Sequence, residues 1–321
     1  MGKAPIKNKA LGGRVGHFSQ TLATLFGVNN LPETSPLSAA EAATRAAEEV
    51  GYRAQAMLLA AGRGERMRPL TDHTPKPLLQ VRGRPLLWYP LQALALAGVS
   101  SAVINTGWLG DQIEPALGSV FSPTVAGVGM TPAATVQLRY SHEGRGPGEA
   151  LETAGGIVRA LPLLAEVFWV AAGDVFAPDF AFSALDFEGF KASPHLAHIW
   201  LVPNPAHNPR GDFGLSAQGL ALNLPKPQAG SPGPESALAQ PPGASPSAPS
   251  PPLFTFSTIA LYKRAFFEAD WCPIPGGNPA GVKAPLAAML RAAMDRGLVG
   301  ASLYEGLWVD VGTPERLAQL N

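Results

Sequence analysis

The chain has 321 residues, with 24 basic and 24 acidic side chains, 46% hydrophobic residues and a single cysteine, Cys272. High hydrophobicity argues against a wholly disordered chain, and balanced charge argues against a broad cationic surface for nucleic acid. A lone cysteine excludes an internal disulfide and a multi-cysteine metal site, and no apolar stretch approaches the ~18 residues of a membrane span. We therefore expect a cytoplasmic protein with neither nucleic acid nor membrane as a partner.

Residues 1–52 differ in character from the rest of the chain. Ser38 and Glu41 form a capping-box pattern at the start of a helix predicted over residues 38–50. A basic stretch without clear periodicity precedes it. We predict an N-terminal extension, partly helical or disordered; a docking arm is the alternative, although no motif supports it.

From residue 53 onward, segments typical of strands and helices alternate, which predicts an α/β fold: a mixed, mostly parallel sheet flanked by helices. The predicted strands are 56–60, 102–105, 136–140, 167–172 and 254–262, and the folded chain is expected to end with residues 307–313. The predicted helices are 85–97, 154–164 and 284–296. Residues 224–252 are rich in proline, serine and glycine, so we expect an inserted, solvated loop there within one domain spanning residues 53–321.

A glycine-rich turn follows the first predicted strand. Gly62 and Gly64 let a ligand approach the backbone closely, and three arginines at positions 63, 66 and 68 share the turn. Lys76 follows between two prolines, which stiffen its backbone. Glycines and fixed cations after a first strand suit a polyphosphate. The turn lacks the Gly-Lys-Ser/Thr of a Walker loop, and Met67 stands where a dinucleotide fingerprint needs its third glycine.

Taken whole, residues 59–71 and the Pro-Lys-Pro-Leu that follows resemble the signature of sugar-1-phosphate nucleotidyltransferases, which have a Rossmann-like fold. The resemblance continues in Gly173-Asp174-Val175 and in residues 308–313, and covers residues 53–320 apart from the proline-rich loop. Within the family, Leu151-Glu-Thr-Ala-Gly-Gly-Ile157 and Arg210-Gly-Asp-Phe213 resemble the uridylyltransferases that act on N-acetylmuramate 1-phosphate in peptidoglycan recycling. Enzymes making GDP-mannose or dTDP-glucose, or a sensor that binds nucleotide sugars without catalysis, are the alternatives.

The resemblance implies Mg²⁺-dependent attack of a sugar 1-phosphate on UTP with release of pyrophosphate, by a monomer or small homo-oligomer. It implies catalytic roles for Arg66, Lys76 and Asp174, and metal binding by Asp174 and Asp310. Implied nucleotide contacts are Ala60, Ala61, Gly62, Gly64, Glu65, Arg66, Lys76 and Gly155. Implied substrate contacts are Glu152, Ala172 and Asp212.

Simpler readings of these residues stay open. Asp174 could form a turn, Asp310 could cap an edge strand, and Asp212 could close an Asx-turn. Residues 152–156 could be a plain helix start capped by Thr153. Ala172 departs from the family pattern, which has an asparagine two residues before the metal aspartate. This departure bears on which sugar is bound more than on which reaction is catalysed.

Overall fold

The computed structural model describes residues 54–123, 135–144, 150–225 and 251–321. The predicted N-terminal extension and nearly all of the predicted proline-rich loop lie outside the described residues. Within them, no helix is long and apolar enough to cross a membrane.

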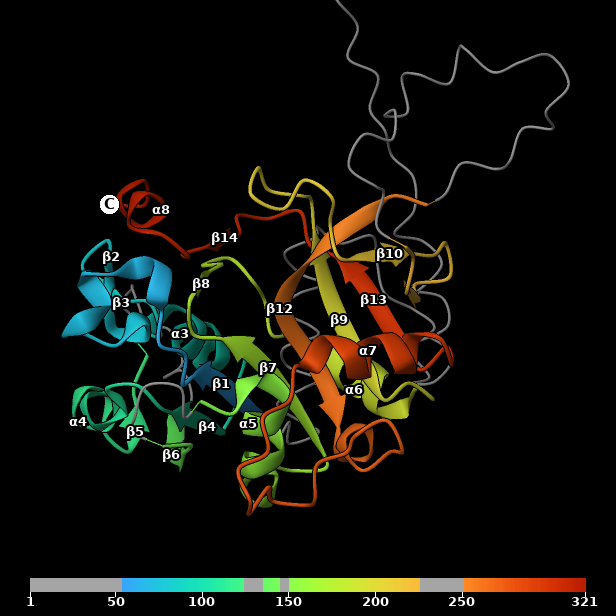
Figure 1. Cartoon of the computed structure of the whole chain (residues 1–321), viewed down its shortest axis with the longest axis horizontal. Coiled ribbons are helices and arrows are strands. Elements are labelled where there is room, and N and C mark those ends of the chain that lie inside the picture. The colour runs from blue at the N-terminus through green and yellow to red at the C-terminus, as the bar shows by residue number, and fades with distance from the viewer. Residues whose placement is uncertain (1–53, 124–134, 145–149, 226–250) are drawn as a thin grey trace, which may run out of the picture. The chain divides into compact units, whose positions relative to one another are not determined.

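A mixed sheet forms the centre of the described domain (Figure 1). Among the described residues it has ten strands, eight of them in the order β11-β10-β12-β7-β1-β4-β6-β5, while β9 pairs with β12 and β13. Their bounds are β1 Gln55–Ala60, β4 Ser101–Thr106, β5 Val120–Phe121, β6 Val136–His142, β7 Val167–Ala172, β9 Ala197–Val202, β10 Phe213–Leu215, β11 Ala221–Leu222, β12 Leu253–Lys263 and β13 Val299–Leu303. The neighbours β7, β1, β4 and β6 run parallel, and β12 pairs antiparallel to β7. The predicted fold class is confirmed.

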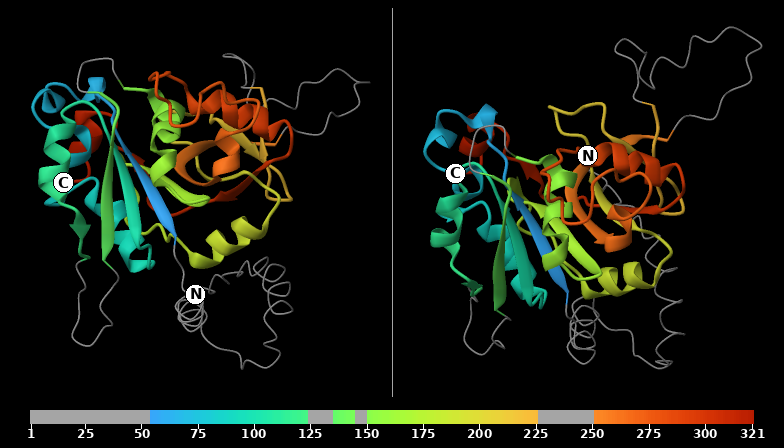
Figure 2. Two further views of the ribbon diagram at one scale, coloured as in Figure 1. Left: turned by 90° about the horizontal axis from the view of Figure 1, so that it is seen from below. Right: turned by 60° about the horizontal axis from the view of Figure 1, so that its bottom comes forward.

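Helices cover both faces of this sheet because its strands alternate their side chains between two apolar cores. On β7, Phe168 and Val170 pack into one core, with residues of α5 and α7, whereas Trp169 and Ala171 pack into the other, with residues of α3 and α6. Figure 2 shows α7 and α6 on opposite sides of the strands. The helix bounds are α3 Trp88–Leu96, α4 Ile113–Leu117, α5 Glu152–Ala160, α6 Ala184–Ala192, α7 Leu286–Met294 and α8 Pro314–Ala318.

Two small sheets and several 3-10 turns modify the predicted elements. The predicted helix 85–97 starts only at Trp88, because Arg84–Pro85 forms strand β3, which pairs with β2 (Gln80–Val81). Within residues 307–313 the structure has one short strand, β14 (Val309–Asp310), which pairs with β8 (Val175–Phe176) rather than with the central sheet. The 3-10 turns are η1 Glu65–Met67, η2 Leu70–Asp72, η3 Lys76–Leu78, η4 Gly110–Gln112, η5 Leu161–Leu163 and η7 Arg264–Phe267.

The parallel strands place their following loops at one edge of the sheet. The carboxyl ends of β1, β4 and β7 are in register, with Ala60 beside Thr106 and Leu59 beside Ala172. In open α/β sheets, ligands bind outside this edge. The glycine-rich turn after β1 and Asp174 after β7 are therefore brought to the same place.

Candidate active site

A cavity of about 870 Å³ opens at the carboxyl edge of the parallel strands. This volume is in the range of sites that hold small molecules or cofactors. Of the predicted site residues, those that line the cavity are Ala60, Ala61, Gly62, Gly64, Glu65, Arg66, Lys76, Glu152, Ala172, Asp174 and Asp212. Gly155 and Asp310 are not among the residues that line it.

The three arginines of the glycine-rich turn have different surroundings. Arg63 donates to the Thr71 carbonyl and to Asp72, both at 2.7 Å, and its guanidinium lies 3.9 Å from the Trp108 ring centre. Arg68 also donates to Asp72, at 2.9 Å. Through these contacts, Arg63 and Arg68 stabilise the conformation of the turn. Arg66 lines the cavity and has no hydrogen bond or ion pair within the described residues, so its guanidinium is available to an anion.

Glycine is required at Gly64, whose φ of +66° is unfavourable for other residues. A Cβ there would also lie 3.1 Å from the Thr71 methyl and 3.3 Å from the Lys76 Cβ. The Thr71 hydroxyl donates to the Gly64 carbonyl at 2.9 Å. The turn is therefore folded tightly against the segment that carries Lys76.

Lys76 and Asp174 form an ion pair within the cavity. Lys76 is buried, and its Nζ lies 2.6 Å from Asp174 Oδ2. Asp174 follows β7 through Gly173, where a Cβ would lie 2.8 Å from a Leu87 methyl and 2.9 Å from the Leu59 carbonyl oxygen. The close approach that this glycine permits sets the position of the Asp174 backbone.

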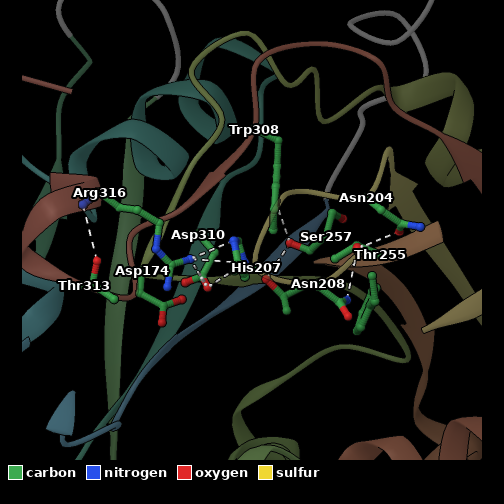
Figure 3. Close-up of polar contacts among 12 residues, drawn as sticks. Asp174, Asn204, His207, Asn208, Thr255, Ser257, Trp308, Asp310, Thr313 and Arg316 are labelled. Carbon is green, nitrogen blue, oxygen red and sulfur yellow. Dashed lines mark hydrogen bonds and ion pairs between the residues drawn. The ribbon is translucent and has the colours of Figure 1, made fainter. Parts of the chain in front are cut away.

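Asp310 lies beside Asp174 on the neighbouring strand. It is opposite Val175 in the β14–β8 pair, and the Val311 N–H donates to the Asp174 carbonyl at 3.0 Å. Figure 3 shows the side chains of Asp174 and Asp310 close together, although they are 136 positions apart in sequence. The two predicted metal carboxylates are thus adjacent.

Two cationic or polar groups hold the Asp310 carboxylate (Figure 3). Arg316 of α8 donates to Asp310 Oδ2 at 2.8 Å, and His207 Nε2 lies 3.4 Å from the same oxygen. Burial and the nearby Arg316 lower the pKa of His207. An added Cβ at Gly312 would be 2.5 Å from Arg316 and 3.1 Å from Arg66, so two guanidinium groups converge beside this glycine.

A buried polar network joins three parts of the opposite wall. Asn105 Oδ1 accepts from the Ala60 N–H at 2.7 Å, and Asn105 Nδ2 donates to Glu143 at 2.5 Å. The second oxygen of Glu143 accepts from the Leu151 N–H at 2.8 Å. Burial raises the pKa of Glu143, while both of its oxygens accept from N–H donors, which the ionised form suits best. The network links the ends of β1, β4 and β6 to the start of α5.

Glu152 stands at the first position of α5 with a φ of +57°, an unusual conformation for a side chain other than glycine. Its side chain lines the cavity. Gly155, one turn further on, is buried: its N–H faces the Ala284 carbonyl at 3.4 Å, and a Cβ there would be 2.5 Å from the Val282 carbonyl. The structure thus gives Gly155 a packing contact, and its nucleotide contact stays a prediction.

Asp212 lines the far end of the cavity but is already engaged. Its Oδ2 accepts from the Asn208 side chain and from the Phe256 N–H, both at 3.1 Å. Its contact with a sugar remains a prediction beside this turn-forming role. Ala172 also lines the cavity and offers no side-chain hydrogen bond there.

The sequence reasoning did not single out several residues at this site. Arg291 and Thr258 line the cavity, and Arg316 contacts Asp310. Arg291 falls within the helix predicted over residues 284–296, so its helical conformation was predictable but the direction of its side chain was not. Arg316 comes shortly after Gly-Thr-Pro, in a short helix. That position was the only feature of the sequence that could have indicated its contact with Asp310.

Comparison with known proteins decides the family. The family model described as nucleotidyl transferase matches residues 55–216. The chain belongs to this nucleotidyl transferase family. A Neisseria meningitidis family member named N-acetylmuramate alpha-1-phosphate uridylyltransferase is 41% identical over 267 residues, covering 83% of this chain and 96% of the relative. A Caulobacter vibrioides protein of the same name is 34% identical, over 51% of this chain and 66% of its own length.

Solved structures of the same fold are more distant in sequence. The inositol-1-phosphate CTP transferase from T. maritima has a TM-score of 0.54 at 16% identity, over 84% of this chain and 96% of that one. A Bacillus anthracis protein named for glucose-1-phosphate thymidylyltransferase activity has a TM-score of 0.59 at 18% identity, over 84% and 94%. At these identities the similarity shows a shared fold only.

Proposed function

We propose that the protein transfers the uridylyl group of UTP to N-acetylmuramate 1-phosphate, giving UDP-N-acetylmuramate and pyrophosphate. The observation that carries this proposal is the convergence of Arg66, Lys76, Asp174 and Asp310 at the cavity's edge, from segments far apart in the sequence. The choice of base and sugar is supported by the two relatives named as N-acetylmuramate alpha-1-phosphate uridylyltransferases. We place the reaction in the cytoplasm, as a step of peptidoglycan recycling.

The charges of the cavity suit two anionic reactants. An oxygen of the sugar phosphate forms a bond to the α-phosphorus of UTP, while the bond from that phosphorus to the bridging oxygen breaks and the electron pair leaves with pyrophosphate. Lys76 is buried, so its charge is poorly screened and acts on phosphate oxygens at close range. Arg66 has a planar group that can donate two hydrogen bonds to the leaving pyrophosphate as charge develops on it.

Asp174 and Asp310 fit a Mg²⁺ ion. Mg²⁺ prefers oxygen ligands and is held by one or two carboxylates together with substrate phosphates. These two carboxylates are adjacent, and the described residues contain no group of three or more His, Cys, Asp or Glu that could hold a metal. The ion would then depend on phosphate oxygens to complete its shell. When bound, it neutralises charge on the triphosphate and orients it for in-line attack.

The backbone of residues 60–62 is suited to the nucleoside. The Asn105–Glu143 network fixes the Ala60 N–H, so the strand end keeps its position without a ligand. A preformed wall of this kind costs less ordering entropy on binding. Glu152, held at positive φ at the cavity wall, is placed to accept a hydrogen bond from a ligand.

Pyrophosphate release tests the proposal. We expect UTP with N-acetylmuramate 1-phosphate to react at least 100-fold more efficiently than GTP with mannose 1-phosphate, in the presence of Mg²⁺. Asp174→Ala should abolish turnover, whereas Asp179→Ala, an exposed aspartate five positions later, should retain it, with unchanged circular dichroism for both. UTP binding without turnover by the native protein would instead favour a sensor, and preference for another pair of substrates would overturn the proposed specificity.

A further inference from the structure

The end of the cavity remote from the ion pair of Lys76 and Asp174 contains an arginine that no carboxylate of the described residues neutralises. Arg291 of α7 lines this end with Phe213 and Phe256. Its NH1 donates to Asn223 Oδ1 at 2.6 Å, and its NH2 donates to the Asp212 carbonyl at 3.3 Å. Both acceptors are neutral oxygens, and no described carboxylate lies within ion-pair distance of Arg291. Three of its five N–H donors have no partner among the described residues.

The guanidinium is held in place before any ligand arrives. It lies over the Phe213 ring, 4.9 Å from the ring centre, and Phe213 is buried. Asn223 is itself fixed, because its amide nitrogen donates to both carboxylate oxygens of Asp295 at 2.9 and 3.1 Å. That contact turns the amide oxygen of Asn223 toward Arg291. A planar, preorganised guanidinium is the group best suited to bind a carboxylate through two hydrogen bonds.

The topology separates Arg291 from the reacting phosphates. Its contacts lie on and next to β10, and β12 stands between β10 and β7 in the sheet. β10 pairs with residues 253–254 of β12 and β7 pairs with residues 259–263, so β10 lies at least two strand spacings, about 10 Å, from the strand that precedes Asp174. Figure 1 shows α7 beside β13 and β9, on the far side of β12 from β8 and β14. A pyranose ring with a substituent spans such a distance, so Arg291 is placed at the distal side of the sugar rather than at its phosphate.

N-acetylmuramate differs from N-acetylglucosamine by a lactyl ether that ends in a carboxylate. We propose that Arg291 binds this lactyl carboxylate and thereby selects the acid sugar. This inference rests on the proposed function, because it names the group that distinguishes the proposed sugar. The apolar side chains of Leu286 and Leu290, which line the cavity on the same helix, suit the methyl groups that the lactyl and acetamido substituents carry.

The test compares N-acetylmuramate 1-phosphate with its lactyl carboxamide, which has the same shape without the charge. In the native protein we expect the carboxamide to have a kcat/KM about 10- to 100-fold lower, the typical value of a charge-assisted contact. Arg291→Gln should lower kcat/KM for the acid by a similar factor and make the two sugars equal within about threefold. The KM for UTP should not change. Arg296→Gln, which removes a surface arginine paired with Asp270 just beyond the same helix, is the matched control and should behave like the native protein.

The outcomes separate this inference from the proposed function. If Arg291→Gln lowers kcat/KM equally for both sugars, or if the native protein does not distinguish them, then Arg291 does not bind the lactyl carboxylate. The proposed uridylyl transfer would be unaffected by that result. If the native protein turns over neither sugar but uses another sugar phosphate, the proposed function fails and the inference fails with it. Should Arg291→Gln not fold, Arg291→Lys keeps the charge but loses the two-pronged geometry, and we expect it to reduce the preference for the acid about tenfold.

Discussion

The buried hydrogen-bond network around Asn105 allows a direct test of what keeps the backbone of residues 60–62 in position at the cavity. Asn105→Ala removes the acceptor of the Ala60 N–H and the donor to Glu143, and both of the groups left behind are buried. An unpaired buried group costs about 1–3 kcal/mol, and a charged oxygen costs more. Water from the adjoining cavity can replace part of these contacts. We therefore expect the free energy of unfolding to fall by about 2–4 kcal/mol, a large share of the 5–15 kcal/mol typical of a domain.

Urea denaturation at pH 7, followed by tryptophan fluorescence, measures this loss, and initial rates at varied UTP measure its effect on binding. The KM for UTP should rise several-fold, because Ala60 and the start of α5 lose their common support. Gln112→Ala is the control: among the described residues its side chain makes a single exposed hydrogen bond, to the His73 carbonyl, and its loss should cost under about 0.5 kcal/mol. A change below about 1 kcal/mol for Asn105→Ala, together with an unchanged KM, would refute the supporting role of the network.

Asn105→Asp separates the two hydrogen bonds. It keeps an acceptor for the Ala60 N–H but sets a second carboxylate against Glu143, whose pKa burial already raises. Two adjacent carboxylates share a proton readily, so the folded-state pKa of the pair lies above that of the unfolded chain. A raised folded-state pKa gives stability that is present at low pH and lost as pH rises. We expect this variant to be closer to the native protein at pH 5 than at pH 8, and equal differences at both would contradict the contact.

Three further predictions concern the turn, the cavity wall and a half-buried histidine. Arg66→Gln should lower kcat/KM about 100-fold at unchanged stability, whereas Arg63→Gln should cost about 1–2 kcal/mol of stability in urea melts, because it loses its contacts to the turn. Gly107→Ala places a Cβ 2.5 Å from the Ala61 carbonyl oxygen, so we expect a several-fold higher KM for UTP in steady-state kinetics. Burial lowers the pKa of His198 to about 4 from 6.5, so the unfolded chain takes up its proton first as pH falls; stability should drop by about 2 kcal/mol between pH 7 and pH 5, and His198→Asn should lose that slope in urea titrations.

The sequence predicted the parts of the fold whose pattern is local. Residues 167–172 were predicted as a strand and form β7 over the same residues, because a run of apolar residues buried on both faces has a clear signature. Strands β9 and β13 were not predicted. Residues 197–202 and 299–303 lie at the side of the sheet, and their assignment depends on pairing with β12 and with each other, which no local pattern reveals. Likewise, the pairing of β14 with β8 rather than with the main sheet is a long-range choice.

The site was predictable where a short motif fixes the geometry and not where side-chain direction decides it. The turn with Gly62 and Gly64, Lys76 between its prolines and Asp174 after a buried strand all lie at the cavity, as the motifs predicted. Their roles in the reaction stay predictions. Arg291 belongs to a helix whose existence was predicted, yet only the contacts of its side chain with Phe213 and Asn223 show that this arginine, rather than the nearby Arg296, lines the cavity.

The pairing of charges across the site explains how it keeps four charged groups together without a ligand. Lys76 neutralises Asp174, and Arg316 neutralises Asp310, so each carboxylate has one cation. Phosphate oxygens attract the same two cations, and a triphosphate that draws Lys76 away leaves Asp174 uncompensated beside Asp310. Two adjacent carboxylates then repel one another and require a cation between them. Under the proposed function, the arrival of the triphosphate would therefore create the demand for a divalent ion. Because Lys76 and Arg316 already pair with the two carboxylates, we expect metal affinity measured without UTP to be weak and to rise when UTP is present.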